Sequence, residues 1–573
     1  MQLPFNSKLL FAFFFVSTFV FSQSAPIKID GNFEDWTTDL ATFYDTNGEN
    51  LNGVDLEEFQ VTNDENYLYI RIKVDQEIDI TDESLIDHNI TLSIDTDNNE
   101  NTGFATQDLY GTEISVVFTS FFAHYNVTPY SQVDLHDIGI QAAPTVTSDE
   151  FEIAIPRNSV PDNTNNLFTN NTIKIVFKNL DNNDAMPNIG SSFSYTFDET
   201  LTAVHAETLD KENNNFIRVL SYNTEQNGLS QTEKHEYFER VISAINPDII
   251  GFVESSNAYN IKGLLDQWIP LGTPEGWYVY EYDGVVTASK WEITQRWFLD
   301  RQFPVLIDLP ESYGTDLLFT NSHLYCCTAD DRRQEQVDEY AAFILDAKSE
   351  GGDITLPENT PFIYAGDLNL VGYSQQLTTL LTGDIRFTNF YGEGAPLDWD
   401  DTDLTSDDSL HNNKSLVYTW RNYNASFLPG KLDFIIYADS VLEKEKSFVL
   451  ETETQSNDIL TQNGLELNDT FLASDHLPVV ADFSIKNETL NTVENADLIN
   501  TMYPNPTSGI INISLDINNV YSIRVFDILG NIVTSQTVNT PFTSIDISNF
   551  SNGIYSITVE TKNSTQTQKI IKQ

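Results

Sequence analysis

The stretch Phe362-Ile-Tyr-Ala-Gly-Asp-Leu-Asn369 decides the fold of the central part of the chain. Its apolar run ends at Gly366 and predicts a buried strand. Because side chains alternate along a strand, Asp367 and Asn369 are expected on one face where the strand ends. A carboxylate beside an amide can hold a hard cation, a phosphate or an attacking water. For this stretch alone, an Asx turn that only closes the strand is the alternative.

Four further stretches follow the same pattern, in which an apolar strand delivers a polar group where it enters or leaves the sheet. The predicted strands cover residues 216–223, 247–254, 317–324 and 431–437. The polar groups, in chain order, are Asn223, Glu254, His323, Asp433 and the pair Asp475–His476. Helical spacing at 234–245 and 331–348 alternates with these strands and predicts a mixed α/β core.

The order Asn, Glu, His, Asp-x-Asn, Asp, Asp-His resembles the endonuclease/exonuclease/phosphatase superfamily. That superfamily includes deoxyribonuclease I, abasic-site endonucleases, inositol-phosphate phosphatases and neutral sphingomyelinases. The resemblance covers residues 215–487 and implies a four-layer α/β/β/α sandwich. It also implies that a divalent cation, Mg²⁺ or else Mn²⁺ or Ca²⁺, assists hydrolysis of a phosphate ester by water.

Roles for the first set of residues follow from that resemblance and from their chemistry. Glu254 is expected to bind the cation, with Asn223 and Asp475 helping directly or through water. Neutral His476 is expected to take a proton from the attacking water near pH 7. Asp433 would accept the other N–H of this imidazole, which fixes its tautomer and stabilises the imidazolium.

The remaining groups are expected to contact the phosphate. Asp367 and Asn369 would orient the water, and His323 would donate to a phosphate oxygen or protonate the leaving oxygen. An extracellular nuclease is the first reading, and a phosphomonoesterase or a sphingomyelinase-like phospholipid diesterase is the alternative. A non-catalytic surface protein for glycan binding or adhesion is an alternative of another class. A non-catalytic protein is expected to have lost some of these polar groups, but none of them is missing from the sequence.

Residues 24–200 form a separate predicted unit, because alternating strands are separated by turns rich in Asn, Asp and Gly. This β-sandwich resembles family 9 carbohydrate-binding modules, which implies a possible glycan partner. Asp95 and Asp97 could hold a structural Ca²⁺ ion, or could belong to a solvated hairpin turn. Trp36 is expected in the core, with stacking on a sugar as the alternative.

The two ends of the chain indicate export. Residues 1–22 are typical of a secretory signal peptide, and no later stretch is apolar enough to span a membrane. Residues 502–573 open with Tyr-Pro-Asn-Pro and resemble the C-terminal sorting domain of type IX secretion in Bacteroidota, a second small β-sandwich. The implied partner is the type IX machinery, and the implied location is the medium or the cell surface. Residues 201–214 and 488–501 are expected to be linkers.

Composition bounds these interpretations. A length of 573 residues predicts several domains, and a net charge of −57 lacks the basic footprint of a protein that grips duplex DNA. Acidity does not exclude a nuclease, because a bound metal can neutralise a phosphate locally. Cys326 and Cys327 are adjacent and form no disulfide framework. Two reduced thiols and a vicinal disulfide both remain open.

Overall fold

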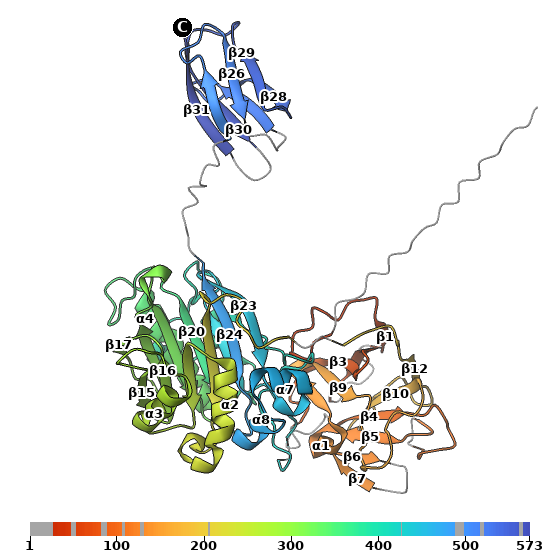
Figure 1. Cartoon of the computed structure of the whole chain (residues 1–573). Helices are drawn as coiled ribbons and strands as arrows, with labels where there is room; N and C mark the ends of the chain where they lie inside the picture. Colours follow the sequence, from red (N-terminus) through yellow and green to blue (C-terminus); the bar gives the residue numbers. More distant parts are fainter. Residues whose placement is uncertain are drawn as a thin grey trace, which may run out of the picture. The chain divides into compact units, whose positions relative to one another are not determined.

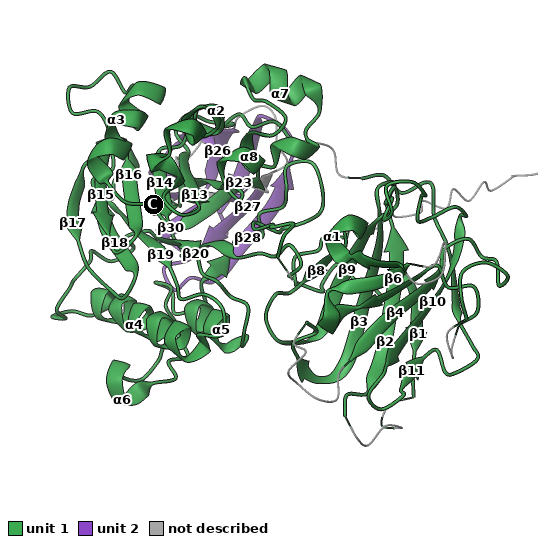
Figure 2. Ribbon diagram, turned by 90° about the horizontal axis from the view of Figure 1, so that it is seen from below, with its two compact units in different colours: residues 1–486 green, residues 487–573 purple. Residues whose placement is uncertain are grey.

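The computed structural model divides the chain into two compact units, residues 1–486 and 487–573 (Figure 2). The predicted signal peptide and residues 488–497 of the predicted second linker lie outside the described residues. The structure describes residues 27–46, 48, 53–81, 89–105, 109–125, 131–203, 207–425, 427–486, 498–515, 521–560 and 565–573.

The first part of unit 1 consists of two antiparallel sheets (Figure 1). One sheet has the order β1-β2-β3-β9-β8, and the other has the order β11-β10-β4-β5-β6-β7 with β12 beside β10. Alternate residues of β3, such as Leu68, Ile70 and Ile72, point into the shared core, as expected for strands with one buried face. The elements are β1 (Ala41–Tyr44), β2 (Leu56–Asn63), β3 (Tyr67–Ile78), β4 (Ile90–Asp95), β5 (Ile114–Val117), β6 (Phe122–Tyr125), β7 (Ser131–Asp134), α1 (Leu135–Ile138), β8 (Gln141–Ala143), β9 (Ser148–Pro156), β10 (Thr172–Asn179), β11 (Ala185–Met186) and β12 (Phe193–Thr196).

The other face of the first sheet is buried against the central part of the chain. Tyr69 of β3 and Ala154 of β9 belong to the same apolar cluster as Leu416 and Tyr418. Trp36 lies in this cluster and donates its indole N–H to the buried Glu152 carboxylate at 2.7 Å. Its predicted core position is therefore confirmed, and its ring is not offered to a sugar.

The central part contains two six-stranded mixed sheets (Figure 1). The first has the order β15-β16-β14-β13-β24-β23, and the second has the order β17-β18-β19-β20-β22-β21. Their strands are β13 (Ile217–Asn223), β14 (Ile249–Val253), β15 (Tyr278–Tyr282), β16 (Val285–Ser289), β17 (Ile293–Arg296), β18 (Gln302–Ile307), β19 (Leu317–His323), β20 (Phe362–Asp367), β21 (Thr405–Ser406), β22 (Asp433–Tyr437), β23 (Leu442–Val449) and β24 (Val479–Ile485).

Buried side chains show how these layers stack. Val219 of β13 packs with Phe319 of β19 in the cluster between the sheets. On the outer side of the first sheet, Leu220 of β13 packs with Phe238 of α2. On the outer side of the second sheet, Leu318 packs beneath α4 and α5. The helices are α2 (His235–Ile245), α3 (Ala258–Trp268), α4 (Asp330–Lys348), α5 (Gln375–Thr382), α6 (Thr388–Tyr391), α7 (Asn457–Asn463) and α8 (Asp469–Ala473).

The prediction of a multidomain chain with an α/β core is confirmed. The helices expected at 234–245 and 331–348 begin within one residue of α2 and α4. Among the described residues, no helix combines the length and the apolar character that a membrane crossing requires.

Unit 2 has a three-stranded sheet, β25-β26-β29, and a four-stranded sheet, β28-β27-β30-β31. Ile511, Ile523 and Ile557 come from both sheets and share one apolar core. The strands are β25 (Ile499–Tyr503), β26 (Ile510–Leu515), β27 (Tyr521–Phe526), β28 (Ile532–Val538), β29 (Phe542–Asp546), β30 (Gly553–Glu560) and β31 (Thr565–Lys572).

Candidate active site

The candidate site forms where the central strands of both sheets end. β13 runs parallel to β14, and β19 runs parallel to β20. Parallel neighbours end at the same edge of a sheet, so each pair delivers two polar groups together. The first pair supplies Asn223 and Glu254, and the second supplies His323 and Asp367, which lie opposite each other in the β-ladder.

An antiparallel neighbour beside each parallel pair adds the remaining groups. β22 pairs with β20 in the register that sets Asp433 opposite Asp367. β24 pairs with β13 and begins at Val479, directly after the segment that carries His476. Because an antiparallel strand starts where its neighbour ends, both residues arrive at the same edge as the first four. Residues distant in sequence thus meet at one end of the two sheets.

Asn223 lies at the centre of the group. Its Nδ2 is 2.9 Å from Asp367 Oδ2, 3.3 Å from Glu254 Oε1 and 3.3 Å from His476 Nε2. His323 Nε2 is 3.7 Å from Asp367 Oδ2 and 3.9 Å from Glu254 Oε1. The structure therefore brings together the predicted residues Asn223, Glu254, His323, Asp367 and His476.

His476 is held from behind by Asp433. Its Nδ1 is 2.7 Å from Asp433 Oδ2, which also accepts the Thr419 hydroxyl at 2.7 Å. Its Nε2 faces Asp367, with 3.6 Å to Oδ2. Burial disfavours the imidazolium, but the negative charges of Asp433 and Asp367 outweigh it and raise the pKa of His476 to about 10. The Asp433 carboxylate thus fixes the ring and stabilises its protonated form.

Asp367 is deeply buried, with 1% of its surface exposed. Burial raises the pKa of this carboxyl group, and the charge of Asp433 raises it further. Gly366 before it has φ +146, and a Cβ atom there would lie 1.8 Å from the Ser322 carbonyl oxygen. The Ala-Gly-Asp sequence therefore needs glycine for the close approach of β20 to β19.

His323 has a partner that the sequence did not indicate. Arg301, in the turn between β17 and β18, places Nη2 2.6 Å from His323 Nδ1. A guanidinium can only donate, so Nδ1 accepts and the ring proton resides on Nε2. Burial, followed by the nearby charges of Arg301 and His476, lowers the pKa of His323 to about 3. His323 is therefore neutral and presents an Nε2–H donor toward Asp367 and Glu254.

Arg301 also belongs to a small cationic layer beside the site. The Tyr325 ring is contacted by the guanidinium of Arg301 at 5.0 Å and by that of Arg332 at 5.2 Å. No sequence signal marked Arg301, because it lies in a turn outside the motifs. Thr419, which donates to Asp433, lies outside the quoted motifs as well.

Two predicted residues lie at the margin of the group. Asn369 has φ +49, donates its backbone N–H to Asp367 Oδ1 at 3.0 Å, and donates its side-chain amide to the Leu324 carbonyl oxygen. Asp475 is half-buried, and its Oδ2 is 3.1 Å from Trp420 Nε1 and 3.5 Å from Asn422 Nδ2. Both are near the catalytic groups in the chain, but their closest contacts are with neighbouring loops.

Three residues of the site bring potential metal-ligand atoms together. One such atom each from Glu254, His323 and Asp367 lies within 4.8 Å of the others. Because Arg301 leaves the ring proton of His323 on Nε2, the two carboxylates are the donors that this arrangement offers to a cation. Glu254 is the most exposed of the three and has φ +49, which turns its side chain away from the strand. Carboxylate oxygens suit a hard divalent cation, so this donor set fits Mg²⁺ or Mn²⁺.

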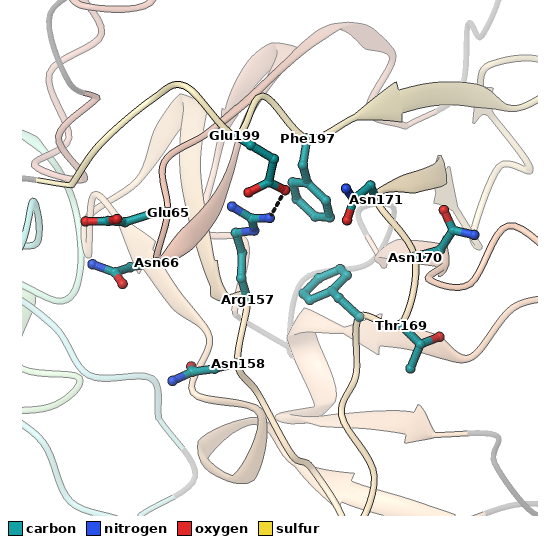
Figure 3. A pocket seen from close by; sticks show the side chains of 10 residues that line it. Glu65, Asn66, Arg157, Asn158, Thr169, Asn170, Asn171, Phe197 and Glu199 are labelled. Atoms are coloured by element: carbon teal, nitrogen blue, oxygen red, sulfur yellow. Dashed lines mark hydrogen bonds and ion pairs between the residues drawn. The ribbon is translucent and has the colours of Figure 1, made fainter.

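Two other sequence features and one pocket lie outside this group of residues. Cys326 and Cys327 are free and exposed. Asp95 and Asp97 lie in the β4–β5 connection together with Glu113. A pocket of about 370 Å³ at one end of the sandwich is lined by Arg157 and Phe197 (Figure 3). The Arg157 guanidinium lies 4.4 Å from the centre of the Phe197 ring and pairs with Glu199 at 2.6 Å.

Comparison with known families places two segments of the chain. Residues 220–476 match the family described as "Endonuclease/Exonuclease/phosphatase family". Residues 501–573 match "Secretion system C-terminal sorting domain". No curated protein matches the sequence.

Several solved structures share low similarity with the chain. TDP2 of D. rerio, complexed with a single-strand DNA product, is 14% identical over 47% of this chain and 99% of its own, with a TM-score of 0.31. An endonuclease/exonuclease/phosphatase from Beutenbergia cavernae is 13% identical over 62% and 100%, with a TM-score of 0.30. ANGEL2, a 2',3'-cyclic phosphatase, is 15% identical over 48% and 97%, with a TM-score of 0.32. Scores of this size carry no conclusion about activity.

Proposed function

We propose that the central domain cleaves phosphodiesters and acts outside the cell as a nuclease. This domain belongs to the endonuclease/exonuclease/phosphatase family and is a phosphoric ester hydrolase. The main support for hydrolysis of a phosphodiester is the arrangement of the site residues. The His476–Asp433 pair, joined at 2.7 Å, faces the same small space as Asn223, Glu254 and Asp367. A base, a metal-ligand candidate and phosphate-binding groups thus converge on one point.

Glu254 and Asp367 would hold the divalent cation, with Asn223 beside them and Asp475 contributing through water. When bound, such a cation offsets the negative charge of the phosphate and of the transition state. Mg²⁺ is the ion that this oxygen-rich set suits best, and Mn²⁺ or Ca²⁺ is the alternative.

His476 would act as the general base through Nε2. Its Nδ1–H is held by Asp433, so Nε2 is the nitrogen free to take a proton from water. In the metal-free protein, Asp433 and Asp367 keep a proton on this ring at neutral pH. Positive charge near Asp367 weakens that effect and favours the neutral ring, which is the form that catalysis requires.

His323, Asn223 and Asn369 would position the phosphate. His323 presents Nε2–H because Arg301 occupies its Nδ1, so it donates a hydrogen bond to a phosphate oxygen. Its lowered pKa argues against the earlier alternative, in which it protonates the leaving oxygen, since a neutral imidazole is a weak acid. Arg301 acts through His323 and is a positioning residue.

The substrate assignment rests on location as well as on chemistry. The sorting domain at 501–573 indicates type IX secretion, so the protein is secreted or displayed at the cell surface. We propose that residues 1–22 start this route as a signal peptide in a member of the Bacteroidota. Nucleic acid outside the cell is a phosphodiester within reach of an enzyme on this route. A glycan partner for the sandwich remains a prediction.

A substrate panel tests the proposal on the chain without its signal peptide. Duplex DNA, single-stranded DNA, RNA, p-nitrophenyl phosphate and sphingomyelin are incubated with Mg²⁺, Mn²⁺ or Ca²⁺, and with EDTA as a control. The expected result is metal-dependent cleavage of nucleic acid that is lost in His476→Ala. His124→Ala, a histidine of the sandwich, is the matched control. Cleavage confined to the monoester or to the lipid would replace the nuclease by one of the alternatives.

A further inference from the structure

The β4–β5 connection of the sandwich gathers three carboxylates that have no part in the proposed catalysis. Asp95 is the last residue of β4, Asp97 follows two residues later, and Glu113 directly precedes β5. Each offers one carboxylate oxygen, and the three oxygens lie within 4.8 Å of one another. The antiparallel pairing of β4 with β5 produces this convergence, because it brings both ends of the connection together.

The three carboxylates divide their oxygens in the same way. One oxygen of each is used by the hairpin: Asp95 Oδ1 accepts from Asn99 N at 3.2 Å, Asp97 Oδ2 from the Thr102 hydroxyl at 2.8 Å, and Glu113 Oε2 from Thr96 N at 2.8 Å. The second oxygen of each is buried and has no hydrogen-bond partner within the described part of the chain. Buried polar atoms without partners are uncommon in folded proteins, and one cation would satisfy all three oxygens.

Burial makes these free oxygens costly. Asp95 is fully buried and Glu113 is 7% exposed. Lys174 Nζ is 3.4 Å from Asp95 Oδ2, but the same ammonium is 3.3 Å from Glu100 Oε1. It therefore offsets only part of the negative charge. Burial raises the pKa of Glu113 to about 7, and the charges of Asp97 and Asp95 add to this effect. A cation would relieve both burial and repulsion.

The hairpin backbone packs closely against the cluster. Gly103 has φ +59, and a Cβ atom there would lie 2.3 Å from the Thr112 carbonyl oxygen and 2.7 Å from Glu113 Oε1. A glycine is therefore needed at this position for the backbone to approach the Glu113 carboxylate.

We propose that Asp95, Asp97 and Glu113 bind one Ca²⁺ ion, which fixes the β4–β5 connection of the sandwich. Ca²⁺ accepts carboxylate oxygens in flexible geometry, whereas Mg²⁺ requires a near-ideal octahedron and retains its waters. This site is separate from the catalytic one, so it does not depend on the proposed function. Extracellular modules bind Ca²⁺ with Kd values of about 10⁻⁴–10⁻³ M, which suits an exported protein.

Calorimetric titration of the chain without its signal peptide tests the site. Every protein in this experiment carries Glu254→Gln, which removes the proposed catalytic cation. CaCl₂ is titrated in 0.1 M KCl, where the Debye screening length is about 10 Å. One saturable Ca²⁺ per chain is expected, with MgCl₂ binding more weakly. Glu113→Gln is expected to weaken Ca²⁺ binding at least tenfold. Glu65→Gln, which removes an exposed carboxylate from the β2–β3 turn, should leave the affinity unchanged.

Lys174→Met provides a second variant that retains all three carboxylates. Removing a competing positive charge beside Asp95 is expected to tighten Ca²⁺ binding severalfold. Near-UV circular dichroism checks that both variants are folded. Equal Ca²⁺ affinity in Glu113→Gln and its parent, or the absence of any saturable event, would overturn the site. Weaker Ca²⁺ binding in Lys174→Met would also contradict the proposal. If Lys174 competes with Ca²⁺ for Asp95, its removal cannot weaken Ca²⁺ binding.

Discussion

Unit 1 contains two carboxylate clusters that differ in how the backbone supplies them. Glu254 and Asp367 come from strands in different sheets, and His323, His476 and Asn223 surround them. Asp95, Asp97 and Glu113 come from one hairpin, whose own backbone N–H and hydroxyl groups surround them. The first cluster has a proton acceptor and a hydrogen-bond donor beside its metal ligands. The donors around the second cluster hold its own carboxylates, so this cluster is suited to bind an ion and not to activate water.

Removing the base should cause the largest change. His476→Ala is expected to lower kcat by about 10²–10⁴-fold, because general base catalysis contributes an amount of this order. His476 contacts Asp433 at 2.7 Å, so His476→Asn is a useful second variant that keeps some polarity. Initial rates with the preferred substrate provide the measurement. Turnover within about threefold of the parent would remove His476 from the mechanism.

Loss of the ligand Glu254 should come next. Residues that only support a metal ligand contribute about 10–100-fold to affinity or activity, so loss of a direct ligand should reach or exceed that range. Glu254→Gln is therefore expected to raise the metal concentration needed for half-maximal rate. Activity is measured against Mg²⁺ concentration. Glu113→Gln serves as the matched control, because its carboxylate belongs to the hairpin cluster. An unchanged Mg²⁺ requirement in Glu254→Gln would show that Glu254 does not bind the catalytic cation. The two clusters would then not differ in this respect.

The positioning role of Arg301 should give a smaller effect. Arg301→Met leaves His323 Nδ1 without its donor, so the ring proton can move from Nε2 to Nδ1. We expect kcat to fall about tenfold, within the range for residues that orient a functional group. Nitrogen NMR of the imidazole reports the tautomer directly. Arg301→Lys, which still donates, should restore part of the rate, and failure to do so together with an unchanged tautomer would refute this role.

The contrast between the clusters also shows what the sequence could reveal. Asp367 and Asp433 were predictable because each lies at a strand end, where the 2-residue period and the sheet edge determine its position, and His476 lies in the short segment before β24. Asp95 and Asp97 were visible for the same local reason. Arg301 and Glu113 were not, because the contacts that matter depend on pairing of β17 with β18 and of β4 with β5. Register between strands is a tertiary property that a single stretch does not encode.

The burial of Trp36 illustrates the same limit in another part of the chain. Its core position was predictable because Trp side chains are highly buried on average in folded proteins. Its partner, Glu152, lies 116 residues away on β9 and is set by the fold. The sheet that carries Glu152 shares its apolar cluster with the central part of the chain, a contact that linker composition does not indicate.

The hairpin cluster should give the smallest effect, and its sign should depend on calcium. In EDTA, Glu113→Gln removes a buried negative charge that has no full partner, so it should raise the unfolding temperature of the sandwich. In millimolar Ca²⁺ the parent gains the binding free energy of the ion and the variant does not, so the order should reverse. Each difference is expected to be about 1 kcal/mol, or about 2–4 °C.

Scanning calorimetry with and without Ca²⁺ measures this reversal, and Glu65→Gln again provides a carboxylate loss without a site. The catalytic cluster cannot produce the same pattern, because Glu254 is partly exposed and water already screens its charge in the metal-free protein. If Glu113→Gln were destabilising by the same amount in EDTA and in Ca²⁺, Glu113 would contribute only its hydrogen bond to Thr96. The proposed structural Ca²⁺ site would then be refuted, and only the catalytic cation site would remain.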